Sequence, residues 1–453
     1  MTILWAETAL TPEGWRDGVR IEIAEGRILS VTCGTEAEGE RHPILLPAPV
    51  NLHSHAFQRA MAGLTERRGP DPKDSFWTWR GLMYRFLDHL TPEDVEAIAA
   101  LVQVEMLEAG YAAVAEFHYL HNAPNGAPYA DPAEMSARIV AAAADTGIGL
   151  TLLPVFYQYG GCDRRPLGPG QMRFFNTPDS FAVLHAAAAQ AVATLPGDAR
   201  IGIAPHSLRA ADPEGLAAVL PLAPDGPVHI HVAEQVAEVE EVLAHRGARP
   251  VRWLLDNAAV DERWCLIHAT QMEPAETEAM ARSGAVAGLC PITESNLGDG
   301  IFDGRRFLDA GGAFGVGSDS NVRIALAEEL RTLEYSQRLR DRARAVLAEQ
   351  KRSTGRVLFE GAVKGGAQAA GRAAGGIAPG LWADLVALDG GAVDLDGRRG
   401  DVILDSYIFA GDDRMVSDVW SAGRHVVTEG RHVSRDRIAA RYRETLARLR
   451  ARL

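Results

Sequence analysis

The sequence predicts an α/β protein whose main domain is a (β/α)₈ TIM barrel, accompanied by a small β-sandwich domain that both termini build. In the middle of the chain, short apolar runs alternate with Ala- and Glu-rich helical segments, which is typical of βα units around a parallel sheet. Both ends instead alternate apolar and polar residues around tight turns, as in VRIEIAEGRILSVTCG near the start and DVWSAGRHVVTEGRHV near the end.

Eight candidate strands are recognised by the polar residues at their ends. In chain order they are ILLPAPVNLHSH, AAVAEFHY, GLTLLPVFYQ, RIGIAPHSLR, PVHIHVAEQ, CLIHAT, AVAGLCPITESN and GAFGVGSDSN. Eight βα units favour a closed barrel, in which the chemistry lies at the carboxyl ends of the strands. We therefore expect residues 1–47 and 372–432 to form the small domain, residues 48–371 the barrel, and residues 433–453 a terminal helix.

Two helices have recognisable beginnings. In TPEDVEAIAALVQVEMLEAG, Thr91 suits the N-cap, Pro92 the first helical position and Asp94 the capping box. In the last segment, Ser434 is the expected N-cap. One apolar stripe of that segment contains Ile438, Tyr442, Leu446, Leu449 and Leu453. We expect this stripe to dock the helix, with its arginines in solvent.

Composition excludes several classes of function. The 453 residues are 47% hydrophobic, which is ample for a core, and a net charge of −14 disfavours nucleic-acid and anionic-membrane partners. The first thirty residues lack the pattern of a signal peptide, and no apolar run reaches membrane-spanning length, so we expect a cytoplasmic protein. The four cysteines form no CxxC pair, which argues against a disulfide framework or a cysteine-rich zinc site.

Histidines at strand ends suggest a metal site. His53 and His55 are one residue apart, so on a strand both face the barrel interior. Partners are His229 or His231 in HIHVAEQ, of which His231 lies nearer the polar end, and Asp319 in GVGSDSN. Asp319 by itself could equally cap a helix. Together, neutral imidazoles and a carboxylate suit zinc or a similar divalent metal, with a position left for water.

Two further groups are candidates for proton transfer. Glu234 follows His231 by three residues, which is the wrong parity for the same strand face, so the chain must turn after Val232 to bring this carboxylate over the metal. It would then move a proton from water to the leaving group; the alternative is a solvated loop glutamate. His268 in CLIHAT points to the same mouth, where it could bind the attacking water or the intermediate, unless it is a core histidine.

These motifs resemble the amidohydrolase superfamily over nearly the whole chain. A narrower resemblance is to its formimidoylglutamate deiminase family, and it rests on NLHSHAFQRAMAGLTERRG, SFWTWR, EFHYLH, PHSLRA, HVAEQ, CPITESNLGDG and GSDSN. The resemblance implies hydrolytic deamination of N-formimidoyl-L-glutamate, a small anionic substrate derived from an amino acid in histidine degradation, to N-formyl-L-glutamate and ammonia. It also implies a homodimer.

The resemblance assigns roles to the residues found above. It implies one divalent metal ion per subunit, zinc or alternatively iron(II), and catalysis by Glu234, His268 and Asp319. The implied ligands are His53, His55, His231 and Asp319. Dinuclear members that resemble dihydroorotase or hydantoinase place a carboxylated lysine on a barrel strand. The only lysines of the sequence, Lys73, Lys351 and Lys364, fall outside the candidate strands, which favours one metal.

The remaining pocket residues are expected to select the substrate. Arginine suits bidentate recognition of carboxylates, and Arg80 in WTWR and Arg209 in HSLR follow candidate strands 1 and 4. The full expected set is Gln58, Arg80, Tyr119, His206 and Arg209. Arg59 stays unassigned, because neighbours on an extended segment face opposite ways.

Three alternative functions can be compared with this interpretation. A mononuclear deaminase acting on guanine or cytosine would stack the base on aromatic side chains and would not need two arginines. An inactive metal-binding scaffold would be expected to have lost Glu234 or His268, and both are present. The cytidine-deaminase fold requires an HxE and PCxxC pattern, which this sequence lacks.

Overall fold

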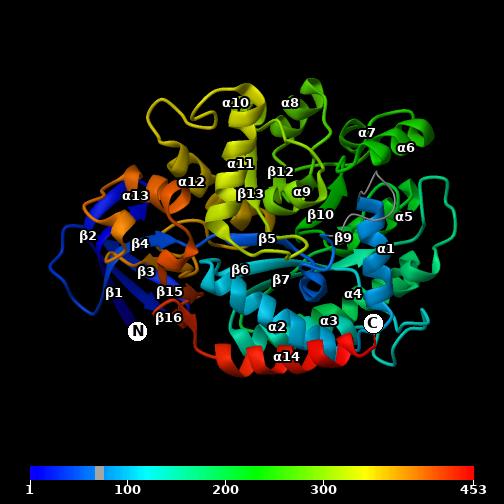
Figure 1. Ribbon diagram of the computed structural model, residues 1–453, viewed down its shortest axis with the longest axis horizontal. Helices are drawn as coiled ribbons and strands as arrows, with labels where there is room; N and C mark the ends of the chain where they lie inside the picture. The colour runs from blue at the N-terminus through cyan, green and yellow to red at the C-terminus, as the bar shows by residue number, and fades with distance from the viewer. Residues whose placement is uncertain (67–75, 453) are drawn as a thin grey trace.

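A closed barrel of parallel strands forms the centre of the molecule, as predicted (Figure 1). The computed structural model describes residues 1–66 and 76–452. The barrel strands are β5 (Val50–Ser54), β6 (Ala113–His118), β7 (Gly149–Phe156), β8 (Arg200–Ile201) with β9 (Ala204–Pro205), β10 (Val228–Val232), β11 (Trp264–His268), β12 (Val286–Leu289) and β13 (Ala313–Val316).

Isolated bridges close the barrel between its two runs of strands. β5 to β9 form one run and β10 to β13 the other. One junction is made by the bridges Ile203–Val228 and Ser207–His231, and the other by Ser54–Asp319. The second junction places Asp319 beside the end of β5, where His53 and His55 lie.

Helices surround the barrel. They are α1 (Phe76–Leu87), α2 (Pro92–Glu108), α3 (Glu134–Thr146), α4 (Pro178–Val192), α5 (Pro213–Val219), α6 (Val236–Arg246), α7 (Pro250–Asn257), α8 (Pro274–Ser283), α9 (Pro291–Leu297), α10 (Gly304–Asp309), α11 (Leu326–Asp341) and α12 (Thr354–Ala369). The predicted capping box at α2 is confirmed: the Asp94 N–H donates to Thr91 Oγ1, and the Thr91 N–H donates to Asp94 Oδ2. No helix of the described residues is both long and apolar enough to cross a bilayer.

The first candidate strand is in fact two strands. β4 (Glu40–Pro47) belongs to the small sheet, and β5 begins the barrel at Val50. Pro47 and Pro49 flank the break, and proline cannot donate a backbone hydrogen bond to a ladder. The chain therefore passes from one sheet to the other at this point.

The two termini together build one eight-stranded sheet, whose order is β17-β16-β15-β14-β4-β1-β2-β3. Its other strands are β1 (Thr2–Thr11), β2 (Gly14–Ala24), β3 (Arg27–Thr32), β14 (Leu385–Leu388), β15 (Val416–Ser421), β16 (Arg424–Thr428) and β17 (Arg431–His432). The predicted hairpin turn has positive φ at both central residues, 50° at Glu25 and 77° at Gly26. The sheet is continuous, and it curls around its own apolar core. The curl brings β3, at one edge, to the segment before β14, where the Ile28 N–H donates to the Leu381 carbonyl.

Buried ion pairs join this sheet to the barrel. Arg372, which follows α12, lies 2.6 Å from Asp384 before β14 and 2.9 Å from Asp198 before β8. Arg424 on β16 also reaches Asp198, at 2.8 Å.

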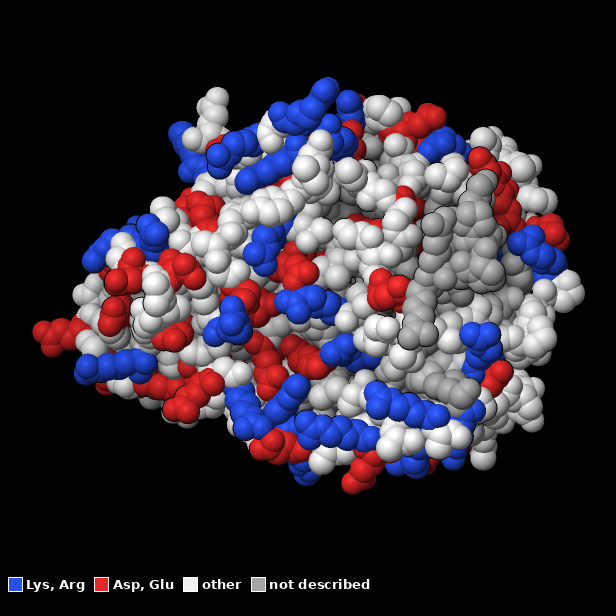
Figure 2. Space-filling view, viewed as in Figure 1, with Lys and Arg blue, Asp and Glu red and all other residues white. Residues whose placement is uncertain are grey.

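The terminal helix α14 (Arg435–Arg450) lies along α2 (Figure 1). Ile438 and Leu449 are buried as predicted, whereas Ser434 makes no capping bond through its side chain, and Leu453 lies outside the described residues. We expected the arginines of α14 to lie in solvent, but Arg448 forms an ion pair with Asp94 on α2 at 2.8 Å. Figure 2 shows basic side chains along this edge with acidic ones interspersed.

Candidate metal centre and active site

The predicted site residues gather around one cavity at the carboxyl ends of the barrel strands. The empty space at this cavity, including the part that opens to solvent, is about 580 Å³. The predicted residues that line it are His55, Gln58, Arg80, Tyr119, His206, Arg209, His231, Glu234, His268 and Asp319. His53, the remaining predicted residue, is fully buried beside them.

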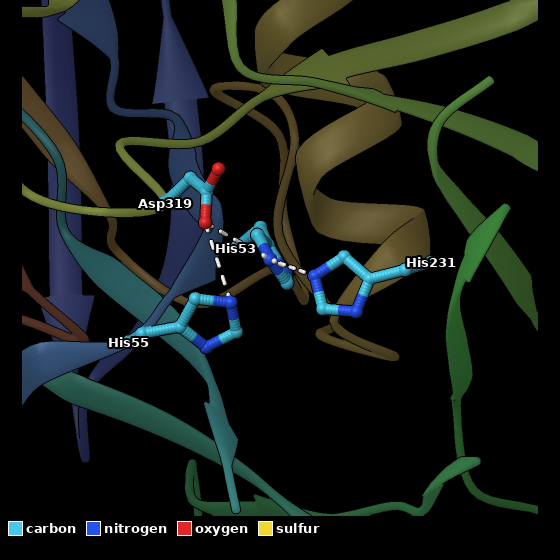
Figure 3. Close-up of side chains that lie close together, drawn as sticks. All are labelled: His53, His55, His231 and Asp319. Atoms are coloured by element: carbon cyan, nitrogen blue, oxygen red, sulfur yellow. Dashed lines mark hydrogen bonds and ion pairs between the residues drawn. The ribbon is translucent and has the colours of Figure 1, made fainter. Parts of the chain in front are cut away.

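Four side chains converge at the base of this cavity (Figure 3). His53 comes from β5, His55 directly follows β5, His231 comes from β10, and Asp319 follows β13; one ligand atom from each lies within 4.8 Å of the others. Asp319 Oδ1 is 3.5 Å from His53 Nε2 and 3.3 Å from His55 Nε2. The two Nε2 atoms of His53 and His231 are 3.0 Å apart.

The hydrogen bonds behind the rings direct lone pairs into this cluster. Nδ1 of His55 lies 3.0 Å from the carbonyl oxygen of Phe117, and Nδ1 of His231 lies 3.2 Å from that of His206. Because a carbonyl only accepts, each Nδ1 carries the hydrogen and each Nε2 presents a lone pair.

The charges of the cluster also suit a cation. Burial lowers the pKa of His53 to about 3 and that of His231 well below its usual value, so both rings are neutral. For Asp319, burial by itself would raise the pKa, but the hydrogen bond from His53 and the neighbouring histidines outweigh it, so the pKa is lowered and the carboxylate is ionised. Neutral imidazoles and one carboxylate aimed at one point fit a divalent metal ion.

Strained backbone at the strand ends orients Asp319. Its φ is 46°, in the left-handed region. The Asp319 N–H donates to His53 O and its carbonyl accepts from His55 N–H, both at 2.9 Å. A buried network completes the support: Ser318 Oγ donates to Asn321 Oδ1 at 2.6 Å, and Asn321 Nδ2 donates to the Asp319 carbonyl at 3.1 Å. Local strain of this kind persists where the surroundings enforce it.

The chain turns after Val232, as the placing of Glu234 requires. Ala233 has a φ of 52°, and the N–H groups of Ala233 and Glu234 donate to the two carboxylate oxygens of Glu238. The turn brings Glu234 into the cavity lining. Burial raises the pKa of Glu234 to about 7, which is suited to a group that both takes and gives a proton near neutral pH.

His268 lies between Glu234 and Asp319. Its Nε2 is 3.9 Å from Glu234 Oε1 and 3.8 Å from Asp319 Oδ2. Burial by itself would lower the pKa of His268, but the carboxylates of Glu234, Glu294 and Asp319 outweigh it and raise the pKa to about 10. The ring can therefore serve as a hydrogen-bond donor at the mouth of the barrel.

Two guanidinium groups line the opposite part of the cavity. Arg80 comes from α1 and Arg209 from the loop after β9. Arg80 Nη2 donates to Tyr157 Oη at 3.1 Å, and Gln171 Nε2 donates to the same oxygen at 2.7 Å. The orientation of the Gln171 amide is fixed because its Oε1 accepts the Gly168 N–H at 2.9 Å. With its oxygen accepting twice, the Tyr157 hydroxyl is left as a donor for a third group.

The other expected substrate contacts also lie in this cavity. Gln58 stands on a 3₁₀ turn (Ala56–Met61) after the metal histidines, and its Nε2 donates to Tyr119 Oη at 2.6 Å. His206, whose pKa burial holds well below its usual value, contacts Ser207 Oγ through Nδ1 at 3.1 Å. Both side chains line the same cavity as His55, His231 and Asp319.

Residues left open by the sequence are resolved by their contacts. Arg59 pairs with Glu105 of α2 at 2.8 Å, so it joins the turn to a barrel helix. His229 contacts the carbonyl of Ala369 at 2.8 Å, away from the cluster, which leaves His231 as the candidate ligand. Lys351 and Lys364 lie outside the barrel strands, and Lys73 lies outside the described residues.

Two site residues were missed in the sequence. Tyr157 follows β7, and its only signal was a polar ring at the end of the candidate strand GLTLLPVFYQ. Glu294, in CPITESN, lies on α9 with its Oε1 3.2 Å from His268 Nδ1. A carboxylate one helical turn beyond a barrel strand was the available signal for Glu294.

Comparison with known proteins identifies the family. Residues 44–426 match the model of the amidohydrolase family, and residues 1–43 match the N-terminal domain of formimidoylglutamate deiminase HutF. The formimidoylglutamate deiminase of Pseudomonas aeruginosa is 50% identical over 99% of this chain and 100% of its own length. A 5-methylthioadenosine/S-adenosylhomocysteine deaminase of Natronomonas pharaonis is 28% identical over 91% of this chain and 87% of its own.

Solved structures of other proteins resemble this chain in fold. An amidohydrolase from Brucella melitensis superposes with a TM-score of 0.96 and 51% identity, covering 99% of this chain and 100% of that one. An atrazine chlorohydrolase from Arthrobacter aurescens, complexed with zinc, has a TM-score of 0.83 at 22% identity over 98% of this chain and 100% of its own, a likeness of fold. The chain therefore belongs to the amidohydrolase family.

Proposed function

We propose that this protein hydrolyses N-formimidoyl-L-glutamate to N-formyl-L-glutamate and ammonia, using one divalent metal ion. The observation that carries the proposal is that one cavity is lined by three members of the four-residue cluster, by Glu234 and by two arginines. The full-length identity of 50% to a formimidoylglutamate deiminase supports the same substrate.

The metal would be held by His53, His55, His231 and Asp319. When bound, such an ion supplies the positive charge that allows a water to lose its proton near neutral pH. We propose zinc, because three imidazoles and one carboxylate suit it and a zinc complex exists among the structural neighbours, with iron(II) as the alternative.

Glu234 would carry the proton. In the reaction, a water oxygen adds to the formimidoyl carbon, the bond from that carbon to the terminal nitrogen breaks, and ammonia leaves. The Glu234 carboxylate takes one proton from water and its carboxylic acid gives it to the terminal nitrogen. As the carbon–nitrogen bond breaks, the hydroxyl group formed on the carbon releases its proton to the departing nitrogen, which completes ammonia and leaves the formyl oxygen. A pKa of about 7 allows both states at physiological pH.

His268 and Asp319 would assist at the reacting carbon. Asp319 Oδ2 lies 3.8 Å from Nε2 of His268. The Asp319 carboxylate would orient the attacking water. A donor at His268 Nε2 would stabilise the charge that develops on the tetrahedral centre.

The glutamate moiety would be bound at the arginine side of the cavity. Arg80 and Arg209 would each bind a carboxylate, and the Tyr157 hydroxyl is oriented to add a hydrogen bond. Gln58, Tyr119 and His206 would contact the formimidoyl group or the nearer carboxylate. All three line the cavity, and the ring centres of Tyr119 and His206 lie 4.8 Å from that of His55 and 5.0 Å from that of His231, respectively.

A nucleobase deaminase is the second candidate. Aromatic rings that could stack a flat base line the cavity, namely Trp79, Tyr84, Tyr119, Tyr157 and Phe174, and the more distant relatives include an 8-oxoguanine deaminase. Two guanidinium groups, that of Arg209 buried and that of Arg80 half-buried, fit a dicarboxylate better than a neutral base.

One assay separates the two candidates. Purified, zinc-loaded protein is incubated with N-formimidoyl-L-glutamate, guanine or cytosine, and ammonia release is measured for each. We expect kcat/KM to favour N-formimidoyl-L-glutamate by several orders of magnitude. Turnover of a nucleobase without turnover of N-formimidoyl-L-glutamate would overturn the assignment.

A further inference from the structure

Glu294 lies directly behind His268, on the side away from the reacting groups. Its Oε1 is 3.2 Å from His268 Nδ1, while the opposite ring nitrogen faces Glu234 and Asp319. Both side chains are buried, with 1% of His268 and 6% of Glu294 exposed. Among the described residues that line the cavity, His268 is present and Glu294 is not. Glu294 therefore contacts the imidazole of His268 but does not line the cavity in which a substrate would bind.

Backbone groups fix the position of this carboxylate. The Cys290 N–H donates to Glu294 Oε1 at 2.9 Å, and the Glu294 N–H donates to the Cys290 carbonyl at 2.9 Å. The Asp299 N–H donates to the Glu294 carbonyl at 2.9 Å. The Cys290 N–H thus holds the carboxylate, while the two backbone bonds fix the main chain of Glu294 within α9.

The backbone of His268 makes such an external support necessary. Its φ is 67°, and that of Ala269 is 48°, so β11 ends in two successive left-handed residues. The regular alternation of strand side chains therefore does not determine where this ring points.

We propose that Glu294 is a positioning residue that acts through His268. Its carboxylate accepts the hydrogen on Nδ1, which orients the ring and keeps its Nε2–H toward Glu234 and Asp319. A carboxylate that orients a histidine in this way is found in other hydrolases and behind many metal-site histidines. The proposal rests on the function proposed above for its catalytic consequence, but not for the hydrogen bond itself.

A second metal ion is the competing interpretation of the same side chains. Ligand atoms of His268, Cys290 and Glu294 lie within 4.8 Å of one another. However, Oε1 of Glu294 lies 3.2 Å from Nδ1 of His268, which is a hydrogen-bond distance. Oε1 of Glu294 also already accepts from the Cys290 N–H. Hydrogen bonding therefore explains this cluster better than a metal.

Substitution of Glu294 tests its effect on turnover. In E294Q, the amide oxygen can still accept from Nδ1 and from Cys290, whereas E294A removes the acceptor. We expect kcat for N-formimidoyl-L-glutamate to fall about 10- to 100-fold in E294A and clearly less in E294Q, with KM within about threefold of wild type. E329Q is the matched control. Glu329, on α11, is also buried, and its carboxylate accepts the N–H of Ile292, which lies on α9 as Glu294 does. E329Q should leave kcat within about twofold, a change worth less than a typical hydrogen bond.

A double-mutant cycle separates positioning from a general structural role. In an H268N background, E294Q and E294A should cause no further fall in kcat, because the group through which Glu294 acts has been removed. Multiplicative losses in the double variants would overturn the proposal. If E294A does not fold, the cycle with E294Q decides alone. Metal analysis should give one ion per chain in wild type and in E294Q; two ions in wild type and one in E294Q would show a second metal instead.

One measurement does not depend on the substrate. In zinc-loaded protein labelled with ¹⁵N-histidine, the His268 resonances are assigned by their absence in H268N. We expect a hydrogen on Nδ1 in wild type, with the Nδ1 and Nε2 shifts altered in E294A. An unchanged spectrum in E294A would refute the hydrogen bond even if N-formimidoyl-L-glutamate proved not to be the substrate. Failure to turn over that substrate, with the expected spectra, would instead refute the proposed function.

Discussion

Replacing Arg209 with methionine should weaken binding of one substrate carboxylate without disturbing the metal cluster. Arg209 lines the cavity and is 7% exposed. Burial by itself would lower its pKa, but Glu238, Tyr157 and Glu234 outweigh this and raise the pKa, so the guanidinium stays charged. Methionine retains much of the apolar length and removes the charge. An arginine in a water-poor pocket is suited to bind a carboxylate through charge-assisted hydrogen bonds.

The size of the effect follows from that geometry. One hydrogen bond to a charged partner contributes about 1.5–3 kcal/mol, and about 1.4 kcal/mol corresponds to a tenfold change in affinity. Loss of about 3 kcal/mol in R209M would therefore raise KM about 100-fold, with a smaller change in kcat.

The assay compares substrates that differ by one charge. KM and kcat are measured for N-formimidoyl-L-glutamate and for its α- and γ-carboxamides, with wild type, R209M and R80M. For the carboxamide that lacks the partner of Arg209, wild type and R209M should differ little, and R80M should show the converse. Metal content and thermal stability control for damage to the fold. Equal losses on all three substrates, or unchanged KM and kcat, would show that the carboxylates bind elsewhere.

Three further changes test other parts of the structure. E234Q should keep its metal but lose about 10²- to 10⁴-fold in kcat, because the proton carrier is gone; full activity would remove Glu234 from the mechanism. Removal of the metal by a chelator should lower the melting temperature, and added zinc should restore it. A ligand that binds only the folded state stabilises it by about 2.7 kcal/mol when present at 100 times its Kd. An unchanged melting curve after full metal removal would contradict the four-residue site. R372M should cost about 3–5 kcal/mol in the free energy of unfolding at pH 7, because it leaves the buried Asp384 carboxylate without its cation and Asp198 with Arg424 alone. Burial by itself would raise the pKa of Asp198, but Arg424 and Arg372 outweigh burial and lower this pKa in the folded state. The stabilisation is therefore fully present above the unfolded-state pKa of about 3.9. It is lost as pH falls through the lower folded-state pKa. Denaturant titrations of wild type and R372M should therefore converge toward pH 3, and a constant difference would contradict the ion-pair explanation.

Strand periodicity and strand ends made much of the site predictable. The two-residue period of a strand placed His53 and His55 on one face, and the common edge of parallel strands brought His231 and Asp319 to them. The wrong parity of Glu234 correctly required a turn, which the positive φ of Ala233 supplies. These relations are local or are fixed by the barrel, so a single sequence contains them.

Long-range contacts were not predictable in the same way. Nothing in the spacing of Glu294 shows that α9 folds back to His268, and nothing beside Tyr157 indicates bonds from Arg80 and Gln171. The division between β4 and β5 was missed because the apolar run is continuous, although two prolines mark the break. The homodimer and the cytoplasmic location stay predictions.

The central claim is that one metal ion in the His53, His55, His231 and Asp319 cluster supports hydrolytic deamination of a formimidoyl group. Zinc is titrated into chelated protein while ammonia and N-formyl-L-glutamate are measured together from N-formimidoyl-L-glutamate. We predict equal amounts of the two products and activity that saturates at one ion per chain. Absence of both products at every zinc loading, or activity that requires a second ion, would contradict the claim.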